Sequence, residues 1–213
     1  MKLEVRNYTK VLNGRNVLNH INLSLESGKV YGLYGRNGSG KTMLFRAMTT
    51  LIFPTEGDVL IDSVSILNEN YDLRQIGLLL EEPGFYPNLS GLENLSMLYE
   101  INHPKDRAHM EDVMNEMGLT DVMNRKYREY SLGMKQRLRI AQAYMEDQKL
   151  ILLDEPTNGL DEDGVVIFRN LIRRLKKQGK LILLASHSKE DLGLLCDVVY
   201  HIEAGAITGE ISL

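Results

Sequence analysis

The amino-acid sequence predicts an α/β fold in which helices cover a mostly parallel sheet. Three observations lead to this prediction. The first third of the chain carries the alternating apolar and polar residues of half-buried strands. The stretch from about 84 to 145 reads as mostly helical. The last third alternates short apolar strands with helices, a rhythm that is typical of parallel sheets.

The N-terminal third is expected to form antiparallel strands. Residues 3–6 and 21–25 alternate apolar and polar side chains, and Asn13-Gly14 between them is a tight-turn signal. Residues 57–62 form a further strand. Residues 76–80 are almost entirely apolar, as expected for a strand at the centre of a parallel sheet. We therefore predict an N-terminal antiparallel β subdomain beside the main sheet.

The middle of the chain is expected to be a helical insertion. Ser90-Gly91-Leu92-Glu93 has the pattern of a capping box, and Ser131 can cap a later helix. Beyond this stretch, residues 150–153 and 181–185 read as buried strands, with a helix from about 162 to 177 between them. We divide the single domain of residues 1–213 into a core, about 1–83 and 146–213, and an inserted helical subdomain, about 84–145.

Residues 35–42 carry the strongest chemical motif of the chain. They match the phosphate-loop pattern, and an apolar strand precedes them while a helix follows. Glycines let such a loop wrap around an anion, and the helix adds the positive end of its dipole. Lys41 would reach the β- and γ-phosphates of a nucleotide, and Thr42 would ligate Mg²⁺. The residues expected to bind ATP here are Gly35, Arg36, Asn37, Gly38, Ser39, Gly40, Lys41 and Thr42.

Two carboxylates follow the apolar strand at 150–153. In an open α/β sheet, ligands gather at the carboxyl ends of the strands. Asp154 would hold Mg²⁺, and Glu155 would polarise the attacking water as a general base. The alternative is a strand that ends in a solvated acidic turn.

Composition excludes several classes of protein. The net charge of -4 gives no basic face for nucleic acid, so no nucleic-acid partner is expected. No apolar run approaches the roughly 20 residues that span a bilayer. The first residues lack the apolar core of a signal peptide, so we expect a cytoplasmic protein. Cys196 lies in an apolar stretch and is expected to be a buried, inert thiol.

Residues 130–137 resemble the signature peptide of the ATP-binding cassette (ABC) ATPases, which begins Ser-Gly-Gly. Ser131 and Gly133 match, whereas Leu132 departs from the commoner glycine. Residues 158–161, which end at Asp161, resemble the loop through which the two sites of a family dimer communicate. Ser186-His187 resembles the switch histidine that contacts the γ-phosphate.

Two further positions depart from the family pattern. Glu81 stands where the family usually has glutamine; it can still ligate Mg²⁺, but it adds charge near the γ-phosphate. Together with residues 83–89, it resembles the branch that exports bacitracin- and lantibiotic-type peptides. The family also stacks an aromatic residue on adenine. The best register places Leu12 there, and Tyr8 serves instead if the Asn13-Gly14 turn shifts the register.

The resemblance implies a P-loop NTPase core and an ATPase that uses ATP and Mg²⁺. The chain would form a homodimer or heterodimer and energise a separate integral membrane permease, at the inner face of a bacterial membrane. The cargo would be an antimicrobial peptide, a drug or a lipid-like molecule. The alternatives are a soluble ABC ATPase of DNA repair, chromosome structure or translation, and a small kinase. Beyond the phosphate loop, the predicted roles are catalytic for Glu155, His187 and Lys41, ATP-binding for Tyr8, Glu81, Ser131, Gly133 and Asp161, and metal-binding for Thr42, Asp154 and Glu81.

Phe85 and Tyr86 lie in a segment bounded by proline and glycine. Exposed aromatic side chains often anchor interfaces. We therefore predict that they dock against a cytoplasmic helix of the membrane subunit. The alternative is that they pack within the helical subdomain.

Overall fold

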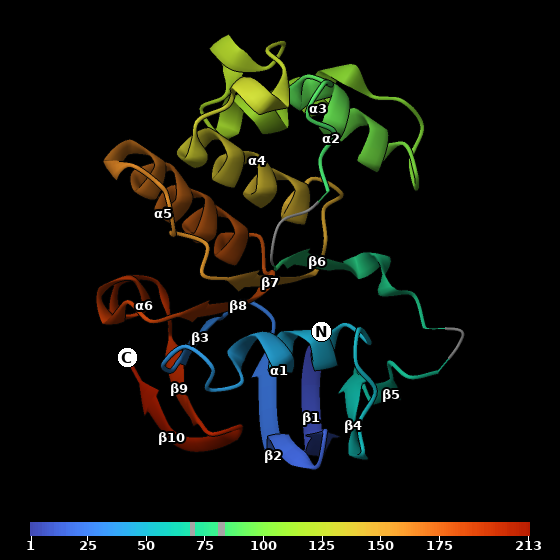
Figure 1. Cartoon of the computed structure of the whole chain (residues 1–213), viewed down its shortest axis with the longest axis vertical. Coiled ribbons are helices and arrows are strands. Elements are labelled where there is room, and N and C mark those ends of the chain that lie inside the picture. The colour runs from blue at the N-terminus through green and yellow to red at the C-terminus, as the bar shows by residue number, and fades with distance from the viewer. Residues whose placement is uncertain (69–70, 81–83) are drawn as a thin grey trace.

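The computed structural model describes residues 1–68, 71–80 and 84–213. In this part of the chain two sheets lie next to each other (Figure 1). The smaller sheet is antiparallel along β2-β1-β4-β5. The larger one has the order β10-β9-β3-β8-β7-β6 and is parallel except at β10. The predicted α/β fold is thus confirmed. The strands are β1 (Lys2–Leu12), β2 (Arg15–Glu26), β3 (Val30–Tyr34), β4 (Glu56–Ile61), β5 (Val64–Ser65), β6 (Ile76–Leu79), β7 (Leu150–Asp154), β8 (Leu181–Ser186), β9 (Val198–Glu203) and β10 (Ala206–Ser212).

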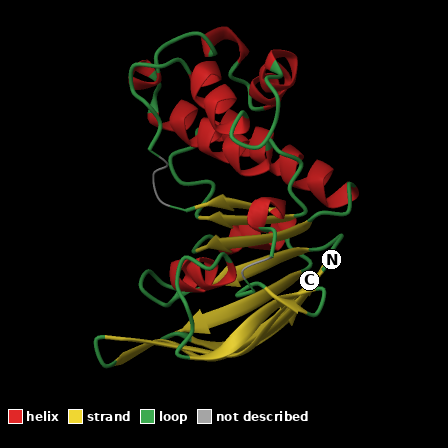
Figure 2. Ribbon diagram, turned by 90° about the vertical axis from the view of Figure 1, so that its right-hand side faces the viewer, coloured by secondary structure: helices red, strands yellow, loops and turns green. Residues whose placement is uncertain are grey.

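The helices divide between the two faces of the larger sheet, as Figure 2 shows. Helix α1 lies between the two sheets, and the longer helices lie on the other side of the larger sheet. They are α1 (Lys41–Met48), α2 (Gly91–Tyr99), α3 (Arg107–Glu116), α4 (Leu132–Tyr144), α5 (Glu162–Lys177) and α6 (Lys189–Leu195), with short 3₁₀ turns at Leu73–Gln75, Thr120–Val122 and Tyr127–Glu129.

The buried side chains of the larger sheet alternate between two cores. In β7, Leu150 and Leu152 pack with α1 and the antiparallel sheet, whereas Ile151 and Leu153 pack with α4 and α5. A strand points successive side chains to opposite faces, so a strand that is covered on both sides is apolar throughout. This explains why the strands that were predicted as entirely apolar lie in the parallel sheet.

Between β6 and β7 the described chain forms α2, α3 and α4, which lie together at one end of the molecule (Figure 1). The predicted capping box is present: Ser90 Oγ accepts the Glu93 N–H at 3.1 Å, and the Glu93 carboxylate accepts the Ser90 N–H at 2.7 Å. The second bond lowers the pKa of Glu93. We keep the division into a core and an inserted helical subdomain as our interpretation of this arrangement.

Candidate functional site

The phosphate loop joins β3 to α1, at the carboxyl end of a central strand. Gly35 approaches its neighbours so closely that a Cβ would lie 2.5 Å from the Ile202 carbonyl oxygen. Gly38 and Gly40 have φ values of 77° and 112°, in the left-handed region that glycine tolerates. Because Gly40 caps α1 without a side chain, the first N–H groups of the helix are left for an anion.

Lys41 lies in the first turn of α1 with its side chain only 6% exposed. Its ammonium group donates to the carbonyl oxygens of Gly35 at 2.7 Å and Arg36 at 3.3 Å. Glu155 Oε1 lies 3.5 Å from the same nitrogen. The loop therefore holds a buried cation where the backbone turns around the site.

Thr42 and Asp154 meet beside this cation. The Thr42 hydroxyl donates to Asp154 Oδ2 at 2.5 Å, which joins the first turn of α1 to the end of β7. A hydroxyl and a carboxylate oxygen are the hard donors that Mg²⁺ prefers. The donor set thus fits this metal, next to the anion-binding loop.

Glu155 and His187 form the third part of the site. His187 Nδ1 lies 2.8 Å from Glu155 Oε2. Glu155 has a φ of 46°, which is uncommon for a residue with a side chain and costs roughly 1–3 kcal/mol. Its N–H donates to the Ala185 carbonyl at 2.8 Å, so the neighbouring strand β8 fixes the turn. This strained turn holds the carboxylate between Lys41 and His187.

Lys41, Thr42, Asp154 and Glu155 line one pocket of about 490 Å³, and His187 is joined to it through its contact with Glu155. Asn37, Gly38 and Gly40–Met43 line it on one side, and Asp154 and Glu155 border it at the end of β7. The remaining wall consists of Arg15–Val17 and Ala204–Gly205. Sequence reasoning did not assign this wall; the tight turn at Asn13-Gly14 was the signal that could have drawn attention to it.

The prediction that Tyr8 stacks on adenine is wrong. The Tyr8 side chain is 0% exposed and lies in the core between the antiparallel sheet and α1. Its hydroxyl donates to the Ile52 carbonyl at 2.9 Å, and burial raises its pKa to about 12. A ring that is packed on both faces has no free surface for a base.

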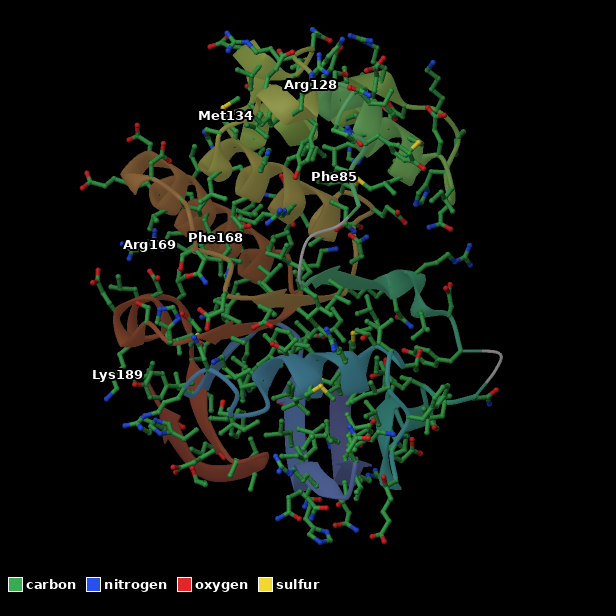
Figure 3. All side chains as sticks on the ribbon, in the orientation of Figure 1. Phe85, Arg128, Met134, Phe168, Arg169 and Lys189 are labelled. Carbon is green, nitrogen blue, oxygen red and sulfur yellow. The ribbon has the colours of Figure 1, made fainter. Side chains whose placement is uncertain are left out.

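The predicted signature residues lie away from this pocket. Ser131 caps α4, with its hydroxyl accepting the Met134 N–H at 3.2 Å. Figure 3 labels Met134 in the first turn of α4, well separated from α1. Gly133 lies against the loop before α5: a Cβ there would meet the Gly159 carbonyl oxygen at 3.1 Å. Asp161 caps α5 by accepting the Gly164 N–H at 2.9 Å.

A buried hydrogen bond connects α4 to the turn that carries Glu155. Gln136 Nε2 donates to the Pro156 carbonyl at 3.0 Å. Pro156 follows Glu155 directly, so α4 and the turn that carries Glu155 are coupled through a single residue. The sequence had placed Gln136 only in the continuation of the signature motif.

The structure buries one of the two aromatic residues, Phe85 and Tyr86, that were predicted to be exposed. Phe85 is 8% exposed and packs edge-on against Tyr127, with the ring centres 5.1 Å apart. The prediction that Phe85 is an exposed anchor is therefore wrong, because its ring is part of the helical core. Tyr86 is 56% exposed. Glu81 lies outside the described residues.

Cys196 has the environment that its apolar neighbours predicted. It is buried at 8% exposure, and this burial raises the pKa of its thiol to about 12. No helix in residues 1–68, 71–80 and 84–213 is long and apolar enough to cross a bilayer.

Comparison with known proteins adds independent information. Residues 18–158 match the family model described as ABC transporter. The chain is 39% identical over 205 residues to the uncharacterized ABC transporter ATP-binding protein YybJ of Bacillus subtilis, covering 96% of this chain and 94% of YybJ. It is 37% identical to the bacitracin transport ATP-binding protein BcrA of Enterococcus faecalis, covering 99% of this chain and 69% of BcrA. It is 35% identical to the lantibiotic transport ATP-binding protein SrtF of Streptococcus pyogenes, covering 96% and 88% of the two chains.

Solved structures agree on the fold. The dimeric structure of MJ0796, a bacterial ABC transporter cassette, superimposes with a TM-score of 0.89 at 24% identity, covering 99% of this chain and 98% of that one. The predicted resemblance is confirmed by the family model and by the relatives, which match almost the full length of the chain. With a phosphate loop and a contact between Glu155 and His187 in one fold, the chain belongs to the ABC transporter family as an ATP-binding ATPase subunit.

Proposed function

We propose that this chain hydrolyses ATP to drive an exporter whose membrane segments belong to a separate polypeptide. One observation carries the catalytic part of the proposal. The Glu155 carboxylate lies in the phosphate-loop pocket with Lys41 Nζ at 3.5 Å and His187 Nδ1 at 2.8 Å. A base between a phosphate-binding cation and an orienting histidine is placed to act on a water at the γ-phosphate.

Each residue would have one task in the reaction. Lys41 would exchange the carbonyl oxygens of Gly35 and Arg36 for the β- and γ-phosphates, because charge-assisted bonds to phosphate are stronger than bonds to a neutral carbonyl. Glu155 would take a proton from the attacking water, and His187 would orient Glu155 and contact the γ-phosphate. Thr42 and Asp154 would hold Mg²⁺, with Glu81 as a further ligand. When bound, Mg²⁺ would neutralise the phosphate charge.

The position of the signature peptide favours a two-chain site. Ser131 and Gly133 lie away from the pocket of their own chain, and Leu132 between them is 65% exposed. We propose that a second ATPase chain, identical or homologous, presents these residues to the bound nucleotide. Asp161, at the start of α5, would lie in the loop that connects the two sites.

The proposed cargo follows from the relatives. BcrA and SrtF carry the words bacitracin transport and lantibiotic transport in their names, which favours an antimicrobial peptide over a drug or a lipid-like molecule. We place the complex at the inner face of a bacterial membrane, with the chain attached to its permease.

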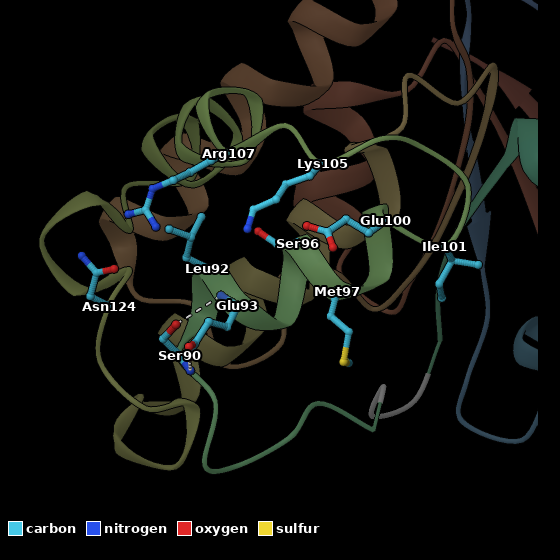
Figure 4. A pocket seen from close by; sticks show the side chains of 10 residues that line it. All are labelled: Ser90, Leu92, Glu93, Ser96, Met97, Glu100, Ile101, Lys105, Arg107 and Asn124. Atoms are coloured by element: carbon cyan, nitrogen blue, oxygen red, sulfur yellow. Dashed lines mark hydrogen bonds between the residues drawn. The ribbon is translucent and has the colours of Figure 1, made fainter.

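We propose that the permease docks on the α2 side of the helical insertion. A hollow of about 590 Å³ runs along this helix and is lined by charged and apolar side chains (Figure 4). Ile101, beyond the end of α2, is 73% exposed, and Met97 on α2 is 39% exposed. Met97 and Ile101 both line the hollow, and the exposed Tyr86 lies near the start of α2, where its N–H donates to Asn94 Oδ1 at 2.7 Å. Such apolar side chains suit the face of an amphipathic cytoplasmic helix.

Replacing Glu155 tests the catalytic proposal. Glu155→Gln keeps the shape of the side chain but removes the base. We expect ATP hydrolysis to slow by about 10²–10⁴-fold, while ATP binding persists and an ATP-bound dimer accumulates on size-exclusion chromatography. Glu162→Gln, which changes an exposed carboxylate in the first turn of α5, is the matched control. A Glu155→Gln variant with normal turnover would refute the assignment of the base.

A double substitution tests the docking surface. Because Tyr86 and Ile101 are exposed, replacing both by alanine should spare the fold and the basal ATPase, yet abolish co-purification with the permease. Leu194→Ala removes a comparably exposed apolar side chain from α6 and should leave assembly unchanged. Intact assembly of the double variant would rule out this surface.

A further inference from the structure

A second pocket lies on the face of the larger sheet that is opposite to α1. It has a volume of about 230 Å³, and side chains of α6, β9 and β10 line it together with Tyr34. Among the described residues, it shares no lining residue with the phosphate-loop pocket. We propose that this second pocket binds an alkyl carboxylate of medium chain length and that the bound ligand slows ATP hydrolysis; the second half of this inference rests on the proposed function.

The wall of the second pocket is mostly apolar. Leu192 on α6 and Val199 on β9 line it and belong to the core that α4 and α5 cover. Ile211 on β10 also lines it, yet this apolar side chain is 49% exposed. Gly193 leaves room beside them, because a Cβ there would meet nothing within 4 Å. The volume of about 230 Å³ equals roughly seven or eight water molecules, which suits a chain of about six to eight carbon atoms. Such a chain would remove the apolar wall from water.

A lysine without an acidic partner lies at the exposed edge of this pocket. Lys189 Nζ lies 5.3 Å from the centre of the Tyr34 ring, and Figure 3 labels Lys189 at the edge of the molecule between α6 and β10. In the part of the chain that the structure describes, no carboxylate forms an ion pair with Lys189. The neighbouring carboxylates of Glu190 and Asp191 instead lie 3.4 Å and 2.7 Å from Arg169 Nη2. An ammonium group beside an apolar wall complements an alkyl chain that ends in a carboxylate.

The second pocket is connected to the catalytic residues through short stretches of backbone. Tyr34 is the last residue of β3 before the phosphate loop, and Lys189 follows His187 by two residues. The segment between them is fixed locally, because the Ser188 N–H donates to Ser186 Oγ at 3.0 Å. A carboxylate bound to Lys189 would therefore restrain the segment that carries His187. We expect the ligand to slow the step in which His187 contacts the γ-phosphate.

Titration calorimetry with octanoate, hexanoate and octylammonium tests the site. Octanoate should bind once per chain and about 10-fold more tightly than hexanoate, because each buried methylene contributes about fourfold in affinity. Octylammonium has the same chain with the opposite charge and should bind at least 10-fold more weakly than octanoate. Lys189→Glu should reverse this preference, so that octylammonium binds better than octanoate; a variant that is merely misfolded would bind neither. Lys177→Glu, at an exposed lysine of α5, is the matched control and should keep the octanoate affinity.

ATP hydrolysis measured with and without octanoate tests the regulatory role. Saturating octanoate should slow the wild type by about 5-fold, the lower end of ordinary coupling between two sites. Ile211→Asp places a negative charge in the wall of the pocket, so it should keep the basal rate and lose the response to octanoate.

Three results would count against these proposals in different ways. The site is overturned if octanoate does not bind the wild type, or if Lys189→Glu and Ile211→Asp leave octanoate affinity unchanged. Regulation is overturned if the wild type binds octanoate and hydrolyses ATP at the same rate with and without it. A wild type that binds octanoate but hydrolyses no ATP under either condition would reject the proposed function and support the site.

Discussion

Replacing Gly35 by alanine should disable the phosphate loop without unfolding the protein. The Gly35 carbonyl accepts the buried Lys41 ammonium group at 2.7 Å, so the position of Gly35 also sets that of the cation. A Cβ at this residue would lie 2.5 Å from the Ile202 carbonyl oxygen, 2.5 Å from Ser39 Oγ and 2.9 Å from Ile202 Cγ2. The Ser39 hydroxyl can rotate away, but the backbone of β9 cannot.

The size of the effect follows from these distances. Restoring an ordinary contact of about 3.4 Å to the Ile202 oxygen requires the loop to move by nearly 1 Å. Overpacking of this kind costs about 2 kcal/mol, which lowers the melting temperature of a chain of this size by about 4–8 °C. A displacement near 1 Å in a site that depends on aligned donors reduces function by about 10²-fold. We therefore expect ATP affinity to fall by roughly that factor.

Calorimetric titration with ATP and thermal melting measure the two effects on the same sample. Gly193→Ala is the matched control, because a Cβ at this position in α6 meets nothing within 4 Å. In a helix, this exchange should stabilise the protein slightly, by about 0.5–1 kcal/mol. If Gly35→Ala bound ATP within twofold of the wild type, the close approach of β9 would not position the loop.

Two further predictions concern the two-chain site and the pH dependence of stability. Lys41→Ala should lower the ATP affinity of the monomer by about 10–100-fold, because a charge-assisted bond to phosphate is lost. Ser131→Arg should leave ATP binding by the monomer unchanged and block dimer formation. If both variants lost monomer ATP affinity equally, a two-chain site would be contradicted. Burial works to raise the pKa of Asp197, but hydrogen bonds from the Lys176 side chain and the Val30 N–H outweigh it and lower the pKa. The carboxylate therefore adds stability that is fully present above its unfolded pKa of about 4 and is lost as the pH falls through the lower folded value. Chemical denaturation from pH 7 to pH 3 should show a smaller acid loss of stability in Asp197→Asn than in the wild type; identical slopes would contradict this role.

Local patterns determined much of this protein. The phosphate loop, the capping box at Ser90 and the helix at 162–177 were readable because each depends on residues that are close in the sequence. The apolar strands were readable for the same reason, since burial on both faces leaves no polar position. The family resemblance relied on motifs of this short-range kind.

Tertiary packing decided in which direction the aromatic side chains of Tyr8 and Phe85 point. Tyr8 and Phe85 were predicted to face a ligand and a partner, yet both are buried, because an aromatic side chain can point to either side of its segment. Which side it takes depends on elements far away in the sequence: the loop that contains Ile52 for Tyr8, and Tyr127 for Phe85. The sequence alone therefore does not specify to which side each aromatic ring points.

The sequence by itself determined which residues are candidates for ATP binding and catalysis, because residue type and local spacing identify a phosphate loop, two carboxylates after a strand and a histidine after another strand. Only the tertiary structure decided that they meet. The neighbouring strands β3, β8 and β7 bring Lys41, His187 and Glu155 to one edge of the sheet, although these residues are far apart in the chain. The same packing turned Tyr8 inward and placed Arg15 in the wall of the phosphate-loop pocket. Such placements depend on long-range strand pairing and core packing, which no local pattern specifies.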